Sequence, residues 1–508
     1  MALKFFNTLS RSVQEFVPRD PSGQSAGLYC CGPTVHDFAH VGNFRTFVFA
    51  DLVRRCLQFK GLQVRHVMNI TDVEDKIIRR VRETNTSLRD YTAKYEAAFF
   101  EDFQALNCLR PHETPHATEN IPAIVSLIEK LLARGVAYRS ADGSVYFSIE
   151  KYQAAGCHYG RLLNLNFDQM RPGQRVSSDE YAKDAVSDFA LWKARVPDDG
   201  AVFWPSPWGE GRPGWHIECS AMSMKLLGPS FDLHLGGEDL IFPHHEDEIA
   251  QSEGAGGQPA GEPFVKYWLH GAHLLVEGKK MSKSLGNYFT LRDLLAKGFT
   301  GREVRYLLLT AHYRESFNFT LDGLQGARAA LARIEECLRK MLEFFDYNAG
   351  GTIINGPAIA AEPDMTILKK VGDALDDDLN VSKAWAVVFE WIHDLNRLIS
   401  QQRLTLDAAK TAIVTWKELD SRLFGLDIRV KTPLRMCEIK GVVPFGTLHS
   451  FVGEEDAPQD ILRLLEARQA ARKAKDFKRS DAIRDELKAK GWAIEDTPKG
   501  PRLKRIVN

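Results

Sequence analysis

Apolar and polar positions change period several times in the N-terminal part of the chain. Residues 28–31 form a short apolar run that stops at Gly32-Pro33, as a buried strand does. From Phe44 to Gly61 the apolar residues recur every three or four positions, which predicts a helix, and residues 64–70 predict a second strand. A strand, a glycine-containing turn, a helix and another strand are the opening of a parallel nucleotide-binding sheet.

The remainder of the chain continues with both element types. Asp142-Gly143 lies between two short apolar runs, which predicts a hairpin. Residues 160–214 are rich in Pro, Gly and Asp and show little periodicity, so we expect an insertion there. The other predicted elements are helices over 72–81, 88–106 and 121–134, strands over 231–235 and within 265–275, and a nearly all-helical region over 321–423.

The composition is that of a soluble enzyme with more than one domain. Of the 508 residues, 44% are hydrophobic and 26% are charged. The longest apolar runs, such as Tyr306–Ala311, are far shorter than the ~20 residues that span a bilayer, and the N-terminus has no leader pattern. The eight cysteines are mostly scattered, as reduced thiols are in a cytosol. We therefore expect a cytoplasmic protein that does not span a membrane.

The net charge of −1 conceals an uneven distribution. Residues 460–508 contain fourteen Lys/Arg and eight Asp/Glu, so this tail carries +6 and the preceding residues carry −7. A basic tail suits contact with a phosphate backbone, and a solvated helix with i,i+4 ion pairs would give the same count. Charge alone leaves both interpretations open.

Two short motifs suit phosphate binding. The residues of 40–43 (HVGN) lie where the first strand turns into a helix, and the free backbone N–H groups of such a turn attract a phosphate. Lys280 and Lys283 flank small hydroxyl residues beside Gly286, a composition suited to a mobile loop that grips a triphosphate. A buried histidine and a solvent-facing basic turn are the alternatives. The sequence G-x-x-x-x-G-K-[ST] does not occur, so the chain is not a P-loop enzyme.

A third group of residues suits a metal ion. His244 and Glu248 are spaced i,i+4 on a predicted helix, so both side chains can converge on one point. With Cys31 and Cys219 they would make a tetrahedral zinc set of two thiolates, an imidazole and a carboxylate. Cys31 lies at the end of the first predicted strand, where ligands bind in open α/β sheets. Two buried thiols beside an ordinary helix face would have the same spacing.

The sequence around these residues resembles one family over nearly its whole length. The first two motifs resemble the HIGH and KMSKS motifs of class I aminoacyl-tRNA synthetases. The surrounding blocks are similar to those of the cysteinyl-tRNA synthetase family: YCCGPTVHDFAHVGN, NITDVEDKII, FALWKA, PGWHIECSAMS, LHLGGEDLIFPHHEDEIAQSE, HGAHLLVEGKKMSKSLGN, ALDDDLNVSKAWAVVFE and ARQAARKAKDFKRSDAIRDEL. The resemblance implies a chain that attaches L-cysteine to tRNA(Cys) with ATP through a cysteinyl-adenylate, and it implies a monomer.

The resemblance also assigns the metal. In the family one zinc ion per chain is held by the residues that match Cys31, Cys219, His244 and Glu248, and the thiolate of the substrate completes its shell. Serine differs from cysteine by one atom, and an apolar pocket separates such near-isosteres only weakly. Zinc binds a thiolate strongly and a neutral alcohol poorly, so the metal would supply the selectivity that packing cannot.

The other site residues follow from the same resemblance. Trp215 and His216 would close over the bound amino acid, in a pocket to which Thr34 also belongs. Asp239 would face the ribose of ATP or the amino group of cysteine. The residues expected to bind the phosphates of Mg-ATP, the co-substrate, are His40, Asn43, Lys280 and Lys283.

Asn43 departs from the family pattern, which has histidine at this place. An amide can donate a hydrogen bond to a phosphate but cannot become cationic. We therefore expect activity to survive, with less pH dependence from this position.

The resemblance implies an α/β chain with a doubly wound, Rossmann-like parallel-sheet catalytic domain, an insertion, a helical bundle and a small C-terminal domain. The expected parts are, approximately, a first catalytic half over 1–112, a connective insertion over 113–210, a second half over 211–276, the KMSKS loop and stem-contact region over 277–318, a helical tRNA-binding bundle over 319–428 and an anticodon-binding domain over 429–508. In the last of these the candidate RNA contacts are Arg468, Arg472, Lys473, Lys475, Lys478 and Arg479 for phosphates and Phe477 or Trp492 for base stacking.

Two other functions are compatible with parts of this pattern. A ligase that gives cysteine to an amino sugar in thiol biosynthesis would share the catalytic half, but it would lack the tail. A catalytically inactive RNA-binding paralogue could keep the zinc as a structural ion. Retention of both lysines, of His40 and of all four metal-ligand candidates argues against the second alternative.

Overall fold

The computed structural model describes two units of the chain, Met1–Val430 and Lys431–Asn508. The described residues are 2–163, 188–348, 361–428, 459–473, 476–490, 492–497 and 500–505. The strands of the first unit are β1 (Lys4–Asn7), β2 (Ser12–Glu15), β3 (Ser25–Cys30), β4 (Gln63–Met68), β5 (Ala137–Arg139), β6 (Val145–Phe147), β7 (Phe189–Ala194), β8 (Gly211–Pro213), β9 (Phe231–Gly237), β10 (Val265–Gly271), β11 (Leu274–Val276), β12 (Lys279–Lys280) and β13 (Phe317–Phe319). Its helices are α1 (Val41–Phe59), α2 (Asp75–Thr84), α3 (Leu88–Ala105), α4 (Ile121–Ala133), α5 (Ile149–Ala154), α6 (Trp215–Leu227), α7 (Glu246–Ala255), α8 (Leu291–Ala296), α9 (Gly301–Leu308), α10 (Leu321–Asn348), α11 (Met365–Leu375), α12 (Val381–Ser400) and α13 (Leu406–Leu419).

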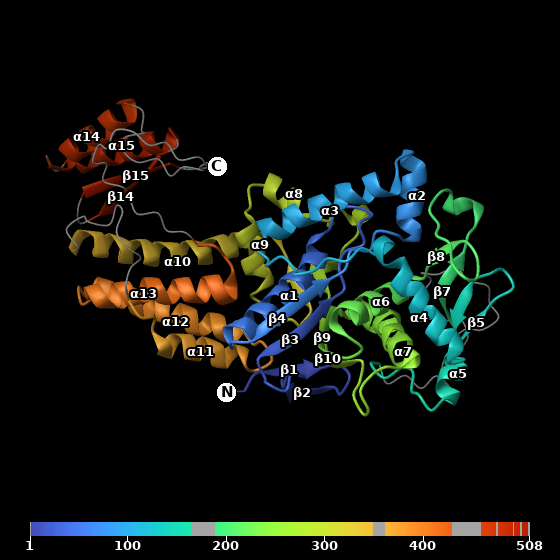
Figure 1. Ribbon diagram of the computed structural model, residues 1–508. Helices are drawn as coiled ribbons and strands as arrows, with labels where there is room; N and C mark the ends of the chain where they lie inside the picture. Colours follow the sequence, from blue (N-terminus) through green and yellow to red (C-terminus); the bar gives the residue numbers. More distant parts are fainter. Residues whose placement is uncertain are drawn as a thin grey trace, which may run out of the picture. The chain divides into compact units, whose positions relative to one another are not determined.

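Four parallel strands form the central sheet of the first unit, in the order β10-β9-β3-β4 (Figure 1). On one face of the sheet, Leu28 and Cys30 of β3 belong to the core that contains α1. On the other face, Tyr29 packs in a core with Cys219 of α6 and Ile249 of α7. Because successive strand residues point to opposite faces, helices pack on both faces of the sheet. The first unit therefore contains a doubly wound α/β sheet, the fold class predicted from the sequence.

A second, antiparallel sheet is formed by the strands that come between β4 and β9 in the sequence. Its order is β5-β6-β7-β8, and its first hairpin turns at Asp142-Gly143 as predicted. The lack of periodicity over 160–214 was misleading, because β7 and β8 belong to this sheet. The first four residues of β7 (FALW) are all buried, so the strand has no alternating pattern to detect. Residues 164–187 lie outside the described part of the chain.

Helix α2 begins three residues later than its apolar pattern suggested. Glu74 is its N-cap and accepts a hydrogen bond from the backbone N–H of Lys76 at 2.8 Å. The carboxylate of Asp72 instead binds the backbone N–H of Thr118 at 3.0 Å, and the carbonyl of Thr71 accepts from the N–H of Val35. These residues belong to the loop at the carboxyl end of β4.

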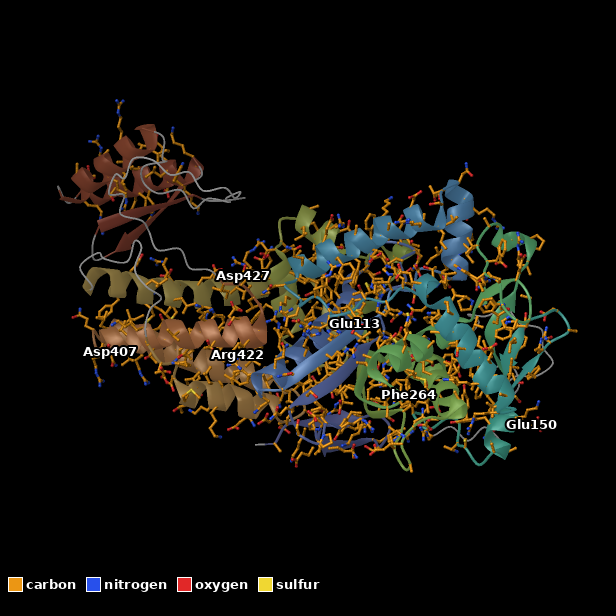
Figure 2. The ribbon with its side chains drawn as sticks, in the orientation of Figure 1. Glu113, Glu150, Phe264, Asp407, Arg422 and Asp427 are labelled. Carbon is orange, nitrogen blue, oxygen red and sulfur yellow. The ribbon has the colours of Figure 1, made fainter. Side chains whose placement is uncertain are left out.

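The helical region follows as predicted, with α10 packed against α13 and α11 against α12. A buried arginine, Arg305 of α9, joins this helical region to α1, which packs on the parallel sheet. It donates to Asp51 of α1 at 2.5 Å and to the carbonyl of Phe424, just beyond α13, at 2.6 Å. Side chains such as Asp407 lie at the surface of the first unit, whereas Phe264 is buried inside it (Figure 2).

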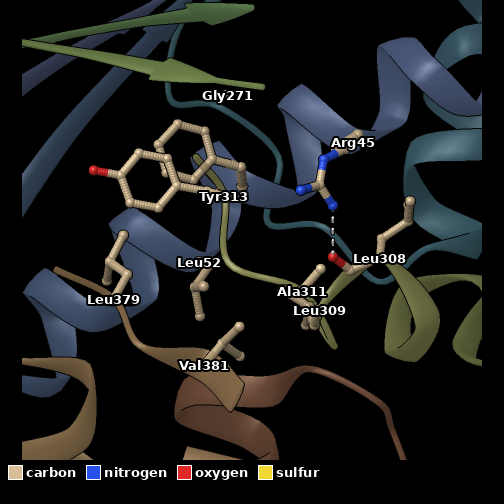
Figure 3. Close-up of a pocket in the computed structure, with 10 residues that line it drawn as sticks. Arg45, Leu52, Gly271, Leu308, Leu309, Ala311, Tyr313, Leu379 and Val381 are labelled. Carbon is tan, nitrogen blue, oxygen red and sulfur yellow. Dashed lines mark hydrogen bonds between the residues drawn. The ribbon is translucent and has the colours of Figure 1, made fainter. Parts of the chain in front are cut away.

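A small cavity lies at the same junction. It is lined by Arg45 and Leu52 of α1, by Tyr313 and by Val381 of α12, among others (Figure 3). Its water-accessible volume is about 20 Å³, room for about one water molecule. None of the residues predicted for the site lines this cavity.

The second unit contains α14 (Gln459–Lys473), α15 (Phe477–Ala489), β14 (Trp492–Thr497) and β15 (Gly500–Arg505). Trp492 is 5% exposed and packs in the core of this unit with Ile461 and Leu487, so the expectation that it stacks on a base is wrong. Arg468 is 4% exposed and is likewise unsuited to a phosphate contact. Arg472 and Arg479 are exposed, whereas the side chains of Lys473, Lys475, Phe477 and Lys478 lie outside the described part.

Among the described helices, none combines the length and the apolar character that crossing a bilayer requires.

Candidate metal centre and active site

Four metal-ligating side chains meet near the carboxyl end of the parallel sheet. Cys31 directly follows β3, and its backbone N–H donates to the carbonyl of Leu235 in β9. Cys219 lies on α6, and Glu248 lies in the first turn of α7, one helical turn after His244. Both helices cover the same face of the sheet. The fold thus brings together four residues that the sequence places in three distant segments.

The ligand atoms of the cluster are close and fully enclosed. Cys31 Sγ lies 3.8 Å from Cys219 Sγ, 3.6 Å from His244 Nε2 and 3.6 Å from Glu248 Oε1. His244 Nε2 and Glu248 Oε1 are 3.1 Å apart, as their i,i+4 spacing predicted. All four ligand atoms lie within 4.8 Å of one another, and all four residues are buried. Two thiols, an imidazole and a carboxylate in this arrangement fit a tetrahedral zinc ion.

The side chains of the cluster shift one another's protonation. Hydrogen bonding from the Cys31 thiol lowers the pKa of Cys219 to about 6, although burial opposes it. Burial raises the pKa of Glu248, but His234 and His244 outweigh it and lower that pKa to about 2. Burial lowers the pKa of His244, but Cys219 and Glu248 outweigh it and raise that pKa to about 10. Burial and the neighbouring Cys219 hold the pKa of Cys31 well above its usual range.

Sequence reasoning missed two histidines that contact the same cluster. His234 Nε2 lies 3.0 Å from Glu248 Oε2, and His245 Nε2 lies 3.4 Å from Cys31 Sγ. With Cys31 and Glu248 they form a second group whose ligand atoms lie within 4.8 Å of one another. The signal was available for His234, because it lies between two leucines in a strand (FDLHLGG) that was predicted from its apolar residues. A buried polar side chain there requires a partner.

The predicted pocket residues Trp215 and His216 lie against one of the metal-ligand candidates. The ring of Trp215 packs on the ring of His244 with centroids 4.5 Å apart. His216 Nδ1 lies 2.7 Å from His244 Nδ1, and His216 Nε2 lies 3.5 Å from Asp247 Oδ2. Two of the residues predicted for the amino-acid pocket thus lie beside the metal-ligand candidates.

The HVGN turn forms the N-terminus of α1. His40 is the N-cap, and its Nδ1 accepts a hydrogen bond from the Asn43 backbone N–H at 3.1 Å. Asn43 Oδ1 in turn accepts from the His40 backbone N–H at 3.0 Å. The two side chains therefore cap the helix reciprocally. Because His40 Nδ1 and Asn43 Oδ1 are the accepting atoms, the atoms through which these side chains could donate to a phosphate are His40 Nε2 and Asn43 Nδ2.

The lysine loop lies directly against this turn. A Cβ added to Gly42 would lie 2.6 Å from Met281 Cε, so the two motifs are in contact at a position where glycine leaves room for the methionine side chain. The backbone N–H of Val41 also donates to the carbonyl of Phe289. Lys280 is exposed in β12, and the side chain of Lys283 lies outside the described part. The two predicted phosphate motifs therefore lie side by side, and their roles in binding ATP stay predictions.

Asn287, which was not predicted as a site residue, makes hydrogen bonds across the loop that carries the lysines. Its Oδ1 accepts from the backbone N–H of Ser282 at 2.9 Å. Its Nδ2 donates to the carbonyl of Val276 at 2.9 Å and to that of Lys280 at 3.2 Å. One buried amide thereby fixes both ends of the segment that carries the lysine.

The last two predicted residues flank the carboxyl ends of neighbouring strands. Thr34 lies in the loop between β3 and α1 and pairs through its backbone with Thr71, which follows β4. Asp239 is exposed in the turn after β9. A Cβ added to Gly237 would lie 2.3 Å from Asp239 Oδ1 and 3.6 Å from Thr46 Oγ1 of α1, so Asp239 lies close to the HVGN helix.

Comparison with protein families matches three consecutive parts of the chain. Residues 19–329 match the model of the tRNA synthetases class I (C) catalytic domain. Residues 370–426 match the DALR domain, and residues 454–501 match the Cysteinyl-tRNA ligase anticodon binding domain.

Curated relatives match over their full length. The chain is 45% identical over 520 residues to the cysteine--tRNA ligase of Chlamydia muridarum (strain MoPn / Nigg), covering 100% of both chains. It is 46% identical over 511 residues to that of Chlamydia trachomatis serovar A, again covering 100% of both, and 42% identical over 506 residues to that of Protochlamydia amoebophila.

Among solved structures, the methionyl-tRNA synthetase of Mycobacterium tuberculosis in complex with methionyl-adenylate superposes with a TM-score of 0.58. It covers 79% of this chain and 92% of its own at 16% identity, and it supports the fold alone.

Proposed function

The chain belongs to the cysteinyl-tRNA synthetase family of class I, and from this premise we propose that it charges tRNA(Cys) with L-cysteine in two ATP-dependent steps. In the first step the cysteine carboxylate attacks the α-phosphate of ATP and pyrophosphate leaves, which gives cysteinyl-adenylate. In the second step the terminal adenosine hydroxyl of the tRNA takes the cysteinyl group and AMP leaves. No side-chain nucleophile is required, so catalysis rests on positioning and on charge stabilisation.

His40 and Asn43 would act on one side of the ATP phosphates. Both side chains sit at the N-terminus of α1, where the helix dipole favours negative charge. Lys280 and Lys283 would close from the other side, on the loop that Met281 brings against Gly42. Charge that develops on the phosphates as pyrophosphate leaves would meet donors from both motifs. Asp239 would bind the ribose from the turn after β9.

The cysteine side chain would enter beside Cys31, Cys219, His244 and Glu248, which would hold zinc. When bound, this ion would ligate a thiolate and discriminate against the neutral hydroxyl of serine. Trp215 would cover the amino acid from its position on the His244 ring, and Thr34 and His216 would contribute to the same pocket. The buried donor set of two thiols, an imidazole and a carboxylate is the observation that carries this proposal.

The helical and C-terminal parts would bind the tRNA. The boundaries near residues 112, 210, 276, 318 and 428 remain predictions. In the second unit, exposed Arg472 and Arg479 are the candidates for phosphate contacts. A match to an anticodon binding domain favours tRNA over an amino sugar as the acceptor.

The decisive experiment charges purified tRNA(Cys) with labelled cysteine, with serine as competitor, before and after zinc is stripped and restored. We expect charging that depends on ATP, prefers cysteine and returns with zinc. Cysteine-dependent ATP–pyrophosphate exchange without transfer to tRNA would point to another acceptor. Absence of exchange would point to an inactive RNA-binding protein. Equal use of serine would overturn the metal-based selection.

A further inference from the structure

Three consecutive carboxylates at the start of α7 have three different sets of partners. Glu248 faces the metal cluster, as described above. Glu246 accepts hydrogen bonds from the backbone N–H groups of Gly160 and Leu162 at 2.7 and 2.8 Å. Asp247, between them, accepts from the hydroxyl of Tyr159 and lies 3.5 Å from His216 Nε2. Asp247 is 1% exposed and Tyr159 is fully buried, so water does not compete for these contacts.

These contacts continue to a metal-ligand candidate. His216 Nδ1 and His244 Nδ1 are 2.7 Å apart, a distance at which one nitrogen must carry the hydrogen and the other must accept it. His244 Nε2 is the nitrogen that faces Cys31 Sγ and Glu248 Oε1. If Nε2 ligates a metal, a neutral His244 carries its hydrogen on Nδ1 and donates to His216. His216 then carries its own hydrogen on Nε2, opposite Asp247.

Every donor and acceptor in this chain of contacts is consistent with a bound cation. Tyr159 donates to Asp247 Oδ1, and the other oxygen of Asp247 faces the N–H of His216. We propose that Tyr159 and Asp247 are positioning residues that, through His216, fix the ring orientation of His244 as a metal ligand. Hydrogen bonds to the second nitrogen of a ligating histidine commonly strengthen the metal site. The inference rests on the proposed zinc function and adds residues that the ligand set does not include.

A purely structural role for Tyr159 has a different signature. The segment that carries Tyr159 is already anchored to α7 by Glu246 through two backbone hydrogen bonds, and Arg161 pairs with Glu253 at 2.8 Å. The ring of Tyr159 packs near Phe189 and Phe242. These contacts remain when only the hydroxyl is removed. Loss of the hydroxyl should therefore affect the metal site more than the fold.

The experiment compares Tyr159→Phe with Tyr152→Phe in the full-length holoenzyme. Tyr152 is 1% exposed and lies in the same part of the chain. Among the described residues, no hydrogen bond joins its hydroxyl to α7. Zinc affinity is measured by competition with a chromophoric chelator, and the absorption of the cobalt(II)-substituted protein reports ligand geometry. We expect zinc affinity to fall about 10-fold in Tyr159→Phe, with altered cobalt absorption, and Tyr152→Phe to match the unmodified chain.

Asp247→Asn supplies a second test, because an amide can still accept a hydrogen bond but carries no charge to favour the His216 donor. We expect a loss of zinc affinity at least as large as that of Tyr159→Phe. Unchanged zinc affinity and cobalt absorption in both variants would overturn the positioning role. An equal loss in Tyr152→Phe would show a general packing effect and would overturn it as well. If the unmodified chain binds no zinc, both the positioning role and the proposed metal-based selection are wrong. This outcome is distinct from the two above, in which the unmodified chain does bind zinc.

Discussion

The side chains of His40 and Asn43 each accept a hydrogen bond from the other residue's backbone N–H, at 3.1 and 3.0 Å. Asn43, which departs from the family pattern, therefore lies inside the turn predicted to bind phosphate and helps to cap its helix. Asn43 has a second role here besides any contact with ATP. Its side chain accepts a hydrogen bond from the backbone N–H of His40, the N-cap of α1, and so helps to orient this histidine.

Asn43→Ala removes the cap and one donor to the phosphates together. We expect ATP–pyrophosphate exchange to fall by about 10-fold or more, because a displaced His40 would no longer meet the developing charge. Asn380→Ala is the matched control: Asn380 caps α12 by accepting from the Lys383 N–H at 3.0 Å, far from the HVGN turn. It should cost a similar amount of stability, about 1 kcal/mol, with exchange unchanged. A silent Asn43→Ala would contradict the assignment of Asn43.

Gly42→Ala tests the contact between the two phosphate motifs. The new methyl group would lie 2.6 Å from Met281 Cε and 3.0 Å from the His40 ring, so one of them must move. We expect the exchange rate to fall about 10-fold, and adding Met281→Ala to restore part of it, since the first clash is with a flexible side chain. Gly326→Ala, on α10 with nothing within 4 Å of the added atom, should have no effect. An unaltered rate in Gly42→Ala would mean that the motifs need not touch.

Metal uptake by the stripped protein should release about two protons at pH 7.5. Cys219, with a pKa of about 6, and Glu248, with a pKa of about 2, are already ionised at this pH. His244, with a pKa of about 10, and Cys31, whose pKa is also raised, are protonated and must lose a proton to ligate. Titration calorimetry in buffers of different ionisation enthalpy gives the number. As the pH falls through about 6, Cys219 also takes up a proton and metal affinity should decline further. Release of no protons would contradict this ligand set.

Asp51→Ala should weaken the junction between α1 and the helical region. Burial raises the pKa of Asp51, but Arg305 and Arg55 outweigh it and hold that pKa below its usual value. The carboxylate therefore stabilises the fold at neutral pH, and this contribution is lost as acid protonates it. Removing it leaves two buried cations unpaired, which costs about 3–5 kcal/mol in the free energy of unfolding measured with urea. Asp198→Ala removes an exposed partner of Arg82 and should cost below about 1 kcal/mol.

The parallel sheet and its ligands were predictable because their residues carry local signals. β3 and α1 follow from an apolar run and a helical period, and the i,i+4 spacing of His244 and Glu248 survives the helical turn at Ile241–His245 that precedes α7. The joining of Cys31 to Cys219 stayed one of two open interpretations until the family resemblance favoured it, because no local pattern encodes a contact across 188 positions.

The failures have equally local causes. β7 is buried on both faces and shows no alternation, so its strand was taken for part of an irregular insertion. α2 starts at Asp75 because Glu74 accepts the capping hydrogen bond, although the preceding residues are also compatible with a helix. Trp492 was offered as a stacking surface, but a small unit needs large apolar side chains for its own core. Asn287, Tyr159 and Asp247 act through side-chain hydrogen bonds and contacts, which leave no periodic trace in the sequence.

The distances in sequence between the ligands also bear on how the chain acquires its metal. Cys31 meets Cys219 and His244 across 188 and 213 residues, so the site cannot exist before β3, α6 and α7 have packed. Bringing together residues so far apart in sequence has a large entropic cost, so we expect these contacts to form late in folding and not around a bound cation. We therefore expect the ion to bind after the chain has folded. Chains made under metal starvation should keep their circular-dichroism spectrum and should bind zinc when it is added. A zinc finger, in contrast, unfolds without its metal.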